Sequence, residues 1–215
     1  MKNFRSPLSR LTHAPAWVKK LSRRALRVAP EIVLRGSAAV LALFATFGFN
    51  PQSLAATDTW ATTGQSTGNW ATGTWTGGNN PPQSGDSLVF GVSNIFALTD
   101  NLMTPSTYNV AGITFSSGAS TYTISAGTVG GNPSGFTLTG GLTNSSSVTQ
   151  TINDNITLTA AQTFTTTTGG GNITLGGVIS GAGGVTMAGT GTLTLNSAGD
   201  TYTGNTTTRA FGFES

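Results

Sequence analysis

Six carboxylates are the side chains best suited to chemistry in residues 56–215, a stretch that contains no cysteine, histidine or lysine. Paired carboxylates hydrolyse glycosidic bonds when one acts as an acid and the other as a base or nucleophile. Neighbouring members of this set are at least 14 residues apart, so they form no local cluster in the sequence. The six are Asp58, Asp86, Asp100, Asp154, Asp200 and Glu214.

Two interpretations apply to these acids. The coils of a repetitive fold could bring Asp86, Asp100 and Asp154 together, whereas aspartate also caps turns through its own side chain. We expect the turn-capping role for each, including Asp154, which alone lies in a polar cluster, between Asn153 and Asn155. The calcium-type repeat Gly-Gly-x-Gly-x-Asp is not found in the sequence. We therefore predict a protein that is not an enzyme and that needs no cofactor and no metal.

Basic residues are concentrated at the N-terminal end of the chain. Nine of the ten lie at or before Arg35, and the tenth is Arg209. Beyond residue 55, Arg209 is set against the six acids, which leaves a net charge of −5. Proteins bind nucleic acid largely through cations that displace counterions from phosphates. Residues 56–215 are therefore not expected to bind nucleic acid.

Residues 1–55 have the pattern of a cleavable secretory signal peptide. A basic segment precedes an uncharged apolar run at residues 36–49, GSAAVLALFATFGF, which Asn50-Pro51 interrupts. Small residues follow at the positions that signal peptidase requires, with Ser53 and Ala55 before the expected cleavage after Ala55 or Ala56. The export machinery and signal peptidase are therefore the first expected partners.

Two alternatives to this leader were weighed. An uncleaved membrane anchor needs about 20 apolar residues, more than the run at 36–49 provides, so we expect no stable membrane insertion after cleavage. Residues 22–26, Ser-Arg-Arg-Ala-Leu, partly match a twin-arginine export motif. An ordinary basic region explains the same residues, so general secretion is favoured.

Three tryptophans mark residues 56–90, which we expect to form an N-terminal cap. Trp60, Trp70 and Trp75 are the only tryptophans beyond the leader. Large aromatic side chains bury about 150–250 Å² each and suit a plug at the open end of a β core. Sugar-stacking platforms are the alternative role, and the absence of a polar cluster beside them favours the plug.

Residues 91–215 consist of short segments in which apolar residues alternate with threonine. Alternation with period two puts apolar side chains on one face and hydroxyls on the other, as in a β-strand. Threonine is β-branched, so it favours the extended backbone while remaining soluble. The clearest segments are Gly112–Phe115, Tyr122–Ile124, Phe136–Leu138, Val148–Ile152, Ile156–Leu158, Ile173–Leu175, Val185–Met187 and Leu193–Leu195.

These segments recur without a helical pattern between them, which suits a sandwich, a barrel or a β-solenoid. Turns of Gly-Gly, in place of the Asn-Gly or Asp-Gly of tight hairpins, favour the solenoid. Similar strand–turn–strand units at residues 137–142 and 174–179 favour it too, because stacked repeats each bury an apolar edge on the next. We therefore predict an all-β fold with a β-solenoid over residues 91–215.

A motif at residues 177–207 adds a family resemblance. Gly-Thr-Gly-Thr-Leu-Thr-Leu-Asn at 189–196 is followed by Asp-Thr-Tyr-Thr-Gly-Asn-Thr at 200–206. This stretch resembles the autotransporter-associated β-strand repeat, or passenger-associated transport repeat, which reads roughly G-x-G-T-L-x-L, a short turn, then x-T-Y-x-G-x-T. The matching residues are Gly189, Gly191, Leu193, Leu195, Thr201, Tyr202, Gly204 and Thr206.

The resemblance implies a right-handed parallel β-helix that follows the signal-peptide helix. It also implies export, with the product secreted or held at a bacterial cell surface in association with the outer membrane. In autotransporters a C-terminal barrel completes export, whereas this sequence stops at Ser215 and departs from the motif after Thr208. We therefore expect an N-terminal fragment whose solenoid is truncated at its C-terminus.

Two functional hypotheses follow. The first is a non-catalytic structural or adhesin-like passenger segment, which would contact a surface polysaccharide or other cells. The alternative is a carbohydrate-binding or polysaccharide-processing β-helix protein. Acids grouped in a groove beside exposed aromatic rings would favour the alternative, whereas scattered acids and buried tryptophans would favour the passenger.

Overall fold

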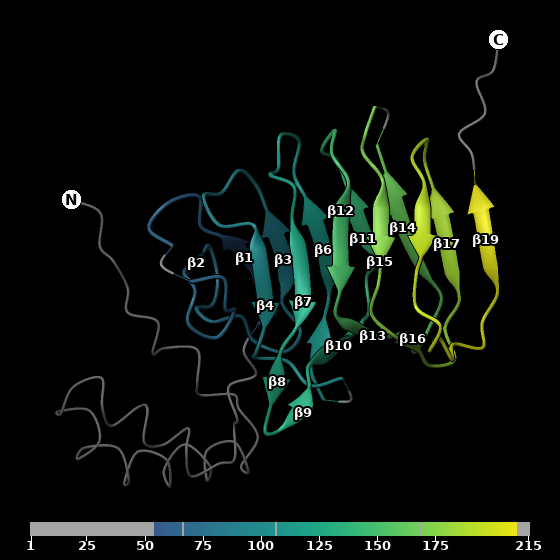
Figure 1. Ribbon diagram of the computed structural model, residues 1–215, viewed down its shortest axis with the longest axis horizontal. Coiled ribbons are helices and arrows are strands. Elements are labelled where there is room, and N and C mark those ends of the chain that lie inside the picture. The colour runs from purple at the N-terminus through teal and green to yellow at the C-terminus, as the bar shows by residue number, and fades with distance from the viewer. Residues whose placement is uncertain (1–53, 66, 106, 168, 210–215) are drawn as a thin grey trace, which may run out of the picture. The chain divides into compact units, whose positions relative to one another are not determined.

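The computed structural model describes residues 54–209 except 66, 106 and 168, and this part of the chain is all β, without a helix (Figure 1). The chain divides into two compact units, residues 1–52 and 53–215, and the second holds every described residue. The expected signal-peptide helix and Ser53 lie outside the described residues. Within them, no helix is long and apolar enough to cross a membrane.

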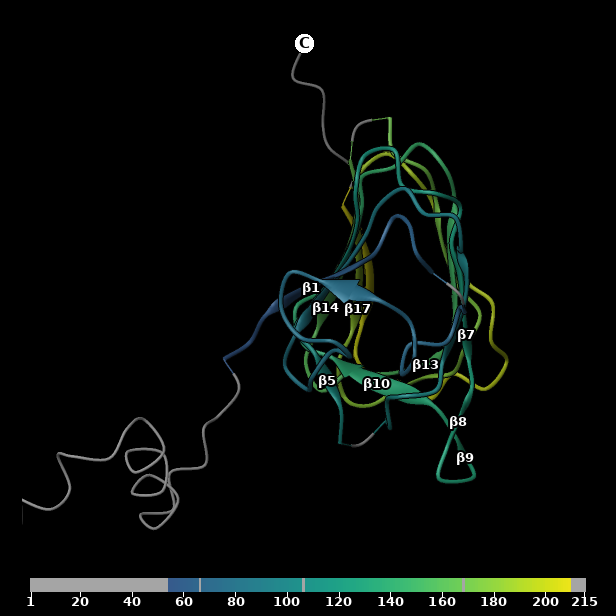
Figure 2. The same cartoon turned by 90° about the vertical axis from the view of Figure 1, so that its left-hand side faces the viewer.

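The strands wind into a β-solenoid of about five turns, which confirms the predicted solenoid architecture. Its sides are three sheets, visible end-on in Figure 2. In spatial order, sheet A contains β19 (Thr206–Arg209), β17 (Val185–Ala188), β14 (Gln162–Thr166), β11 (Leu142–Asn144), β6 (Gly112–Phe115), β3 (Ser87–Phe90), β1 (Thr57–Trp60) and β2 (Trp75–Thr76). Sheet B contains β18 (Leu193–Leu195), β15 (Ile173–Leu175), β12 (Gln150–Asn153), β7 (Thr123–Ala126) and β4 (Ala97–Asp100). Sheet C contains β16 (Ile179–Ser180), β13 (Asn155–Thr157), β10 (Gly135–Leu138) and β5 (Asn109–Val110).

Each turn of the solenoid passes from sheet A to sheet B to sheet C, and corresponding strands stack in parallel. Two pairings depart from this rule. Strand β2 runs antiparallel to β1 at the end of sheet A. The hairpin of β8 (Thr128–Val129) and β9 (Asn132–Pro133) projects from the corner between β7 and β10 (Figure 2).

The alternation of apolar residues with threonine has the predicted structural meaning, as sheet B demonstrates. One column of inward side chains is entirely aliphatic, so each turn buries its apolar edge on the next. The neighbouring outward column holds threonines from four successive strands. The inward column is Leu98, Ile124, Ile152, Leu175 and Leu195, and the outward threonines are Thr123, Thr151, Thr174 and Thr194.

One sequence-based equivalence is wrong. Residues 137–142 and 174–179 look like the same unit, but the first connects β10 to β11 and the second connects β15 to β16. They therefore occupy different corners of the coil, between sheets C and A and between sheets B and C. Gly-Gly turns fit any sharp corner, so their recurrence does not identify equivalent positions.

Aromatic side chains close the N-terminal end of the solenoid. Trp60 and Trp70 are fully buried and Trp75 is 3% exposed. Trp75 makes edge-to-face contacts with both other tryptophans, and Trp70 stacks on Phe90 with ring centroids 6.1 Å apart. Phe90 stacks in turn on Phe115 of the next turn, at 5.2 Å. The plug interpretation is confirmed, because no ring face of the three tryptophans is free to stack on a sugar.

The expected cap region, residues 56–90, supplies strands as well as the plug. Strands β1 and β3 pair in parallel with each other, and β3 pairs in parallel with β6. Sheet A therefore begins at Thr57, and the tryptophans pack inside its first turn.

Candidate functional site

Four aspartates form two buried pairs inside the solenoid, although the acids form no local cluster in the sequence. Asp58 lies beside Asp86, and Asp100 lies beside Asp154. All four are between 0% and 2% exposed. Stacked turns bring distant residues into adjacent positions, so sequence separation does not keep acids apart in this fold. Asp200 is half-buried in the C-terminal part, where its Oδ1 accepts from Ile179 N at 2.8 Å.

The first pair lies where the described chain enters sheet A. Asp58 occupies an inward position of β1, in register with Leu88, and Asp86 immediately precedes β3. Asp86 Oδ1 accepts from Ala56 N at 2.8 Å, and its Oδ2 accepts from Gln83 N at 2.6 Å and from Asn79 Nδ2 at 2.8 Å. The backbone N–H of Asn79 donates to Asp58 Oδ1.

These contacts move the two pKa values apart. Burial and the hydrogen bond with Asp86 raise the pKa of Asp58 from 3.8 to about 6. Burial opposes ionisation of Asp86 too, but donation from Ala56 N, Asn79 and Gln83 holds its pKa below 3.8. Asp86 therefore ionises first, and below about pH 6 it is the ionised member of the pair.

The second pair lies at the corner where the β8–β9 hairpin leaves the solenoid. Asp100 pairs with Ala126 at the end of β4, and Asp154 directly follows β12, so the two aspartates lie two turns apart at one corner. Asp100 Oδ1 accepts from the backbone N–H groups of Leu102 and Met103, both at 2.9 Å. The predicted turn-capping role is therefore confirmed for Asp100.

Asp154 is held from the hairpin side of the same corner. Its Oδ1 accepts from Ser134 Oγ at 3.0 Å and from Asn155 N at 2.9 Å. Ser134 Oγ also accepts from Gly127 N at 2.9 Å, so this serine ties the root of the hairpin to the aspartate pair.

Burial disfavours ionisation of both carboxyl groups of the second pair. The Oδ2 atoms of Asp100 and Asp154 are both buried and accept no hydrogen bond from other described residues. Burial, followed by the charge of Asp154, raises the pKa of Asp100 to about 8, and burial raises the pKa of Asp154. Ionising both of two adjacent buried carboxyl groups is unfavourable in free energy.

Neither pair is arranged to act on an external substrate. A polysaccharide-cleaving pair must contact its substrate from an open groove, whereas these four carboxyl groups are enclosed by their own turns. Within residues 54–209, apart from the three undescribed positions, no group of three or more histidine, cysteine, aspartate or glutamate side chains could hold a metal ion.

The expected cleavage site lies at the start of the described part of the chain. Leu54 is 89% exposed, Ala55 is exposed and Ala56 is half-buried. Among the described residues, Ala56 is the first whose backbone is hydrogen-bonded through both groups, because its carbonyl accepts from Ser87 N at 2.8 Å while its N–H donates to Asp86.

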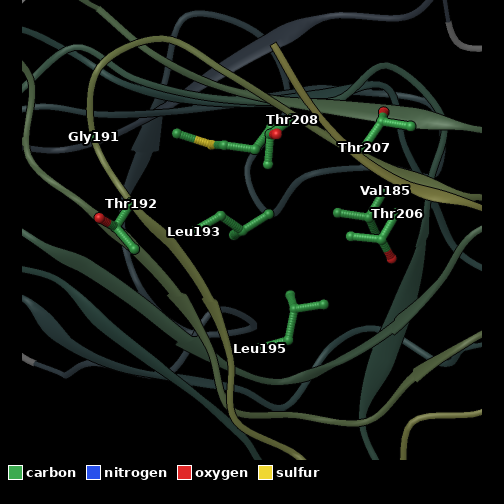
Figure 3. A pocket seen from close by; sticks show the side chains of 9 residues that line it. Val185, Gly191, Thr192, Leu193, Leu195, Thr206, Thr207 and Thr208 are labelled. Carbon is green, nitrogen blue, oxygen red and sulfur yellow. The ribbon is translucent and has the colours of Figure 1, made fainter. Parts of the chain in front are cut away.

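The C-terminal end of the solenoid contains a hollow of about 240 Å³ (Figure 3). The side chains of Val185, Leu193 and Leu195 converge on it, and the half-buried leucines form part of its wall. Thr206 and Thr208 line the same hollow from β19. They pair with Val185 and Met187, which places polar residues in inward columns that are apolar in the preceding turn.

The residues of the repeat motif form most of this last turn. Gly189 has a φ of +110° after β17, and a side chain there would overlap Thr166 O of the turn below. Gly191 N donates to Thr166 Oγ1 at 2.8 Å. Leu193 and Leu195 belong to β18, Thr201 N donates to Ile179 O at 2.8 Å, and Tyr202 Oη lies 2.7 Å from Thr206 Oγ1, with Gly204 in the turn between them.

Sequence reasoning missed the aspartate pairs, although one signal was present. Asp58 follows the alternation of its strand into an inward position, between outward Thr57 and Thr59 and next to buried Trp60. An acid at an inward position of a β-strand needs a partner. Reading Thr57–Trp60 as a strand would have revealed that need.

Comparisons of the chain with protein-family models, with curated proteins and with solved structures found no match.

Proposed function

We propose that this protein is exported and processed, and that its mature part is a non-catalytic, adhesin-like passenger segment of autotransporter type at a bacterial cell surface. The carrying observation is the outward threonine column of sheet B, which presents hydroxyls from four successive turns without a charge. Such a surface stays soluble and offers regularly spaced donors and acceptors. A surface polysaccharide, itself a repeating array of hydroxyls, is the partner that this chemistry favours.

The last turn supports the autotransporter assignment. Six of the eight motif positions fall on one strand–turn–strand unit, β18 to β19, and Gly189 and Gly191 lie in the turn that leads into it from β17. We take the solenoid to be right-handed, as in that family, because crossovers between parallel strands of one sheet are right-handed in about 98% of proteins.

The alternative of a polysaccharide-processing enzyme is less favoured. Its two structural requirements were grouped acids in a groove and exposed aromatic rings. The aspartates are grouped but enclosed, and Trp60, Trp70 and Trp75 are in the core.

Export can be tested with the full chain in a Gram-negative host. We expect a product that starts at Ala56 or Thr57 by mass spectrometry and that protease digests on intact cells. Leu43→Arg, in the apolar run, is the control and should abolish both results. An uncleaved full-length chain in the cytoplasm would refute the proposal.

The adhesive role is tested with the purified mature part and immobilised surface polysaccharide. Thr151→Lys combined with Thr174→Lys interrupts the column of sheet B and should reduce binding at least about tenfold, since the hydroxyl array is broken. Thr163→Lys, on the outward face of sheet A, is the matched control. Equal binding by all three proteins would argue against sheet B as the adhesive face.

A further inference from the structure

Two carboxylates surround the backbone nitrogen of Ala56, where the described chain enters the solenoid. Ala56 N lies 2.8 Å from Asp86 Oδ1. Asp58, two residues further along, faces the same carboxylate, and its Oδ2 is buried without a hydrogen-bond donor from the described residues. A peptide N–H supplies one proton and no charge, so it leaves this arrangement incompletely neutralised.

The loop after β2 closes over the nitrogen of Ala56 and the two aspartates. A side chain at Gly78 would overlap both Ala56 Cβ and Asp58 Oδ1. Only glycine therefore lets the loop approach closely enough for Asn79 to donate to both aspartates, from its backbone to Asp58 and from its side chain to Asp86. The arrangement fits tightly around the nitrogen of residue 56.

Within residues 54–209, apart from the three undescribed positions, no side-chain cation contacts these carboxylates. Beyond residue 55 the chain has a single basic residue, Arg209, which belongs to β19 at the opposite end of sheet A. Buried carboxylates are ordinarily paired with a cation. The missing positive charge must come from a group other than a described side chain.

We propose that cleavage of the Ala55–Ala56 bond supplies this charge, so that the new α-ammonium group of Ala56 forms an ion pair with Asp86 and Asp58. The inference rests on the proposed export and processing. In the hydrolysis, water adds across the peptide bond. Its oxygen completes the carboxylate of Ala55, which leaves with the leader, and the nitrogen of Ala56 becomes an ammonium group.

Processing and stability are coupled by this arrangement. The nitrogen already lies at hydrogen-bond distance from Asp86, so the ammonium group forms in place and its ion pair is charge-assisted. In the precursor, a proton on Asp58 relieves repulsion within the pair below about pH 6. In the mature chain the ammonium group takes over that role, and the folded part becomes more stable once the leader is gone.

The direct test compares two forms of residues 56–215, the compact unit that processing leaves. One form carries a free amine at Ala56, and the other is acetylated there. Acetylation is a matched control, because it restores the uncharged N–H of the precursor and changes nothing else. At pH 6 we expect the free-amine form to have an unfolding equilibrium constant about fivefold to tenfold smaller.

The pH dependence of this difference has a defined sign. An unperturbed α-amino group has a pKa of about 8, and a carboxylate partner raises it, so its contribution is complete below pH 8 and disappears as pH rises further. The lowered pKa of Asp86 makes its contribution complete above about pH 4. Tyr108, the other titratable group near these charges, stays neutral because burial raises its pKa. The difference should peak near pH 6 and vanish above about pH 10.

A substitution cycle separates the ion pair from other effects of acetylation. In Asp86→Asn the two forms should differ less than twofold, whereas in Asp200→Asn, at the far end, the full difference should remain. Because Asp86→Asn can weaken folding by itself, Asp58→Asn provides a second variant, and it should reduce the difference by about half. Equal stability of the two wild-type forms at pH 6 would overturn the inference, as would a difference that survives Asp86→Asn.

The first residue of the exported product distinguishes this inference from the proposal on which it rests. A mature chain that begins at Ala56 supports both, whereas one that begins at Thr57 supports export and overturns the ion pair. If the chain is not exported, the proposed function fails, and the comparison of free and acetylated chains still decides whether the two aspartates hold an ammonium group.

Discussion

The two ends of the solenoid differ in how the inside of the terminal turn is covered. At the N-terminal end, Trp60, Trp70 and Trp75 fill the first turn, and β2 covers the edge of sheet A by antiparallel pairing. At the C-terminal end of the described chain, Leu193 and Leu195 remain half-buried around a hollow, and threonines replace apolar residues along the inner side of β19.

The buried charges follow the same division. All four fully buried aspartates lie in the first three turns, where donors from loops and corners surround them. In the last two turns, Asp200 is half-buried and no described acid is enclosed. The N-terminal turns therefore hold enclosed aromatic rings and enclosed charges with specific partners, whereas the C-terminal turns form a regular stack that ends in polar residues.

The largest expected effect is the loss of the aromatic plug. Trp70→Ala should lower the free energy of unfolding by about 3–5 kcal/mol, because it opens a cavity among Trp75, Phe90 and Trp60. Urea denaturation followed by circular dichroism measures this loss. Trp70→Phe is the control and should cost much less, since it keeps an aromatic ring and removes an indole N–H that has no partner among the described residues.

The buried aspartates should give the N-terminal half an unusual pH dependence. The pKa of Asp100 is raised from 3.8 to about 8, so the folded state is favoured below pH 4 and loses this contribution as pH rises towards 8. Asp100→Asn removes the charge and should stabilise the protein by about 2 kcal/mol at pH 8, with little effect at pH 4.

Thermal unfolding of this variant between pH 4 and pH 8 provides the measurement. Asp200→Asn, in the C-terminal half, is the matched control and should change stability by less than about 0.5 kcal/mol throughout. A wild-type stability that rises from pH 4 to pH 8, with Asp100→Asn following it in parallel, would contradict the raised pKa of Asp100.

Shortening a side chain should lower the free energy of unfolding less at the open end than in the interior. Leu195→Ala should cost about 1 kcal/mol, because its side chain is only half-buried, whereas Leu175→Ala, one turn below in the same column, should cost about 3 kcal/mol. Urea denaturation of the two variants gives the comparison. Equal losses would mean that the C-terminal end is covered in solution.

The smallest expected effect comes from the polar inner side of β19. Thr208→Val places a methyl group where the hydroxyl faces the hollow opposite Met187, and should raise stability by about 0.5 kcal/mol, or about 1–2 °C in melting temperature. Thr207→Val, on the outward face, is the control. It should give no gain, since it removes the contact between Thr207 Oγ1 and Thr186 Oγ1 at 2.9 Å. A gain from both variants would remove the distinction between inner and outer faces.

Much of the fold was predictable because alternation is a local property. Segments such as Ile173–Leu175 and Leu193–Leu195 are strands with the predicted bounds. Strands with weaker patterns escaped prediction, notably β14, where Gln162 and Thr166 take buried positions that a hydropathy pattern assigns to the surface. The burial of Trp60, Trp70 and Trp75 followed from composition, since large aromatic rings without polar neighbours favour the core.

The sequence by itself determined the period-two alternation, the glycine corners and the charge asymmetry, and these imply an all-β stack that begins after a basic leader. Which acids become neighbours depends on the tertiary structure. Asp58 joins Asp86 and Asp100 joins Asp154 because the length of each turn, set by its loops, determines which residues become neighbours in the stack. Pairing between turns is non-local, so the surroundings of a buried charge depend on the assembled coil and cannot be read from the flanking residues.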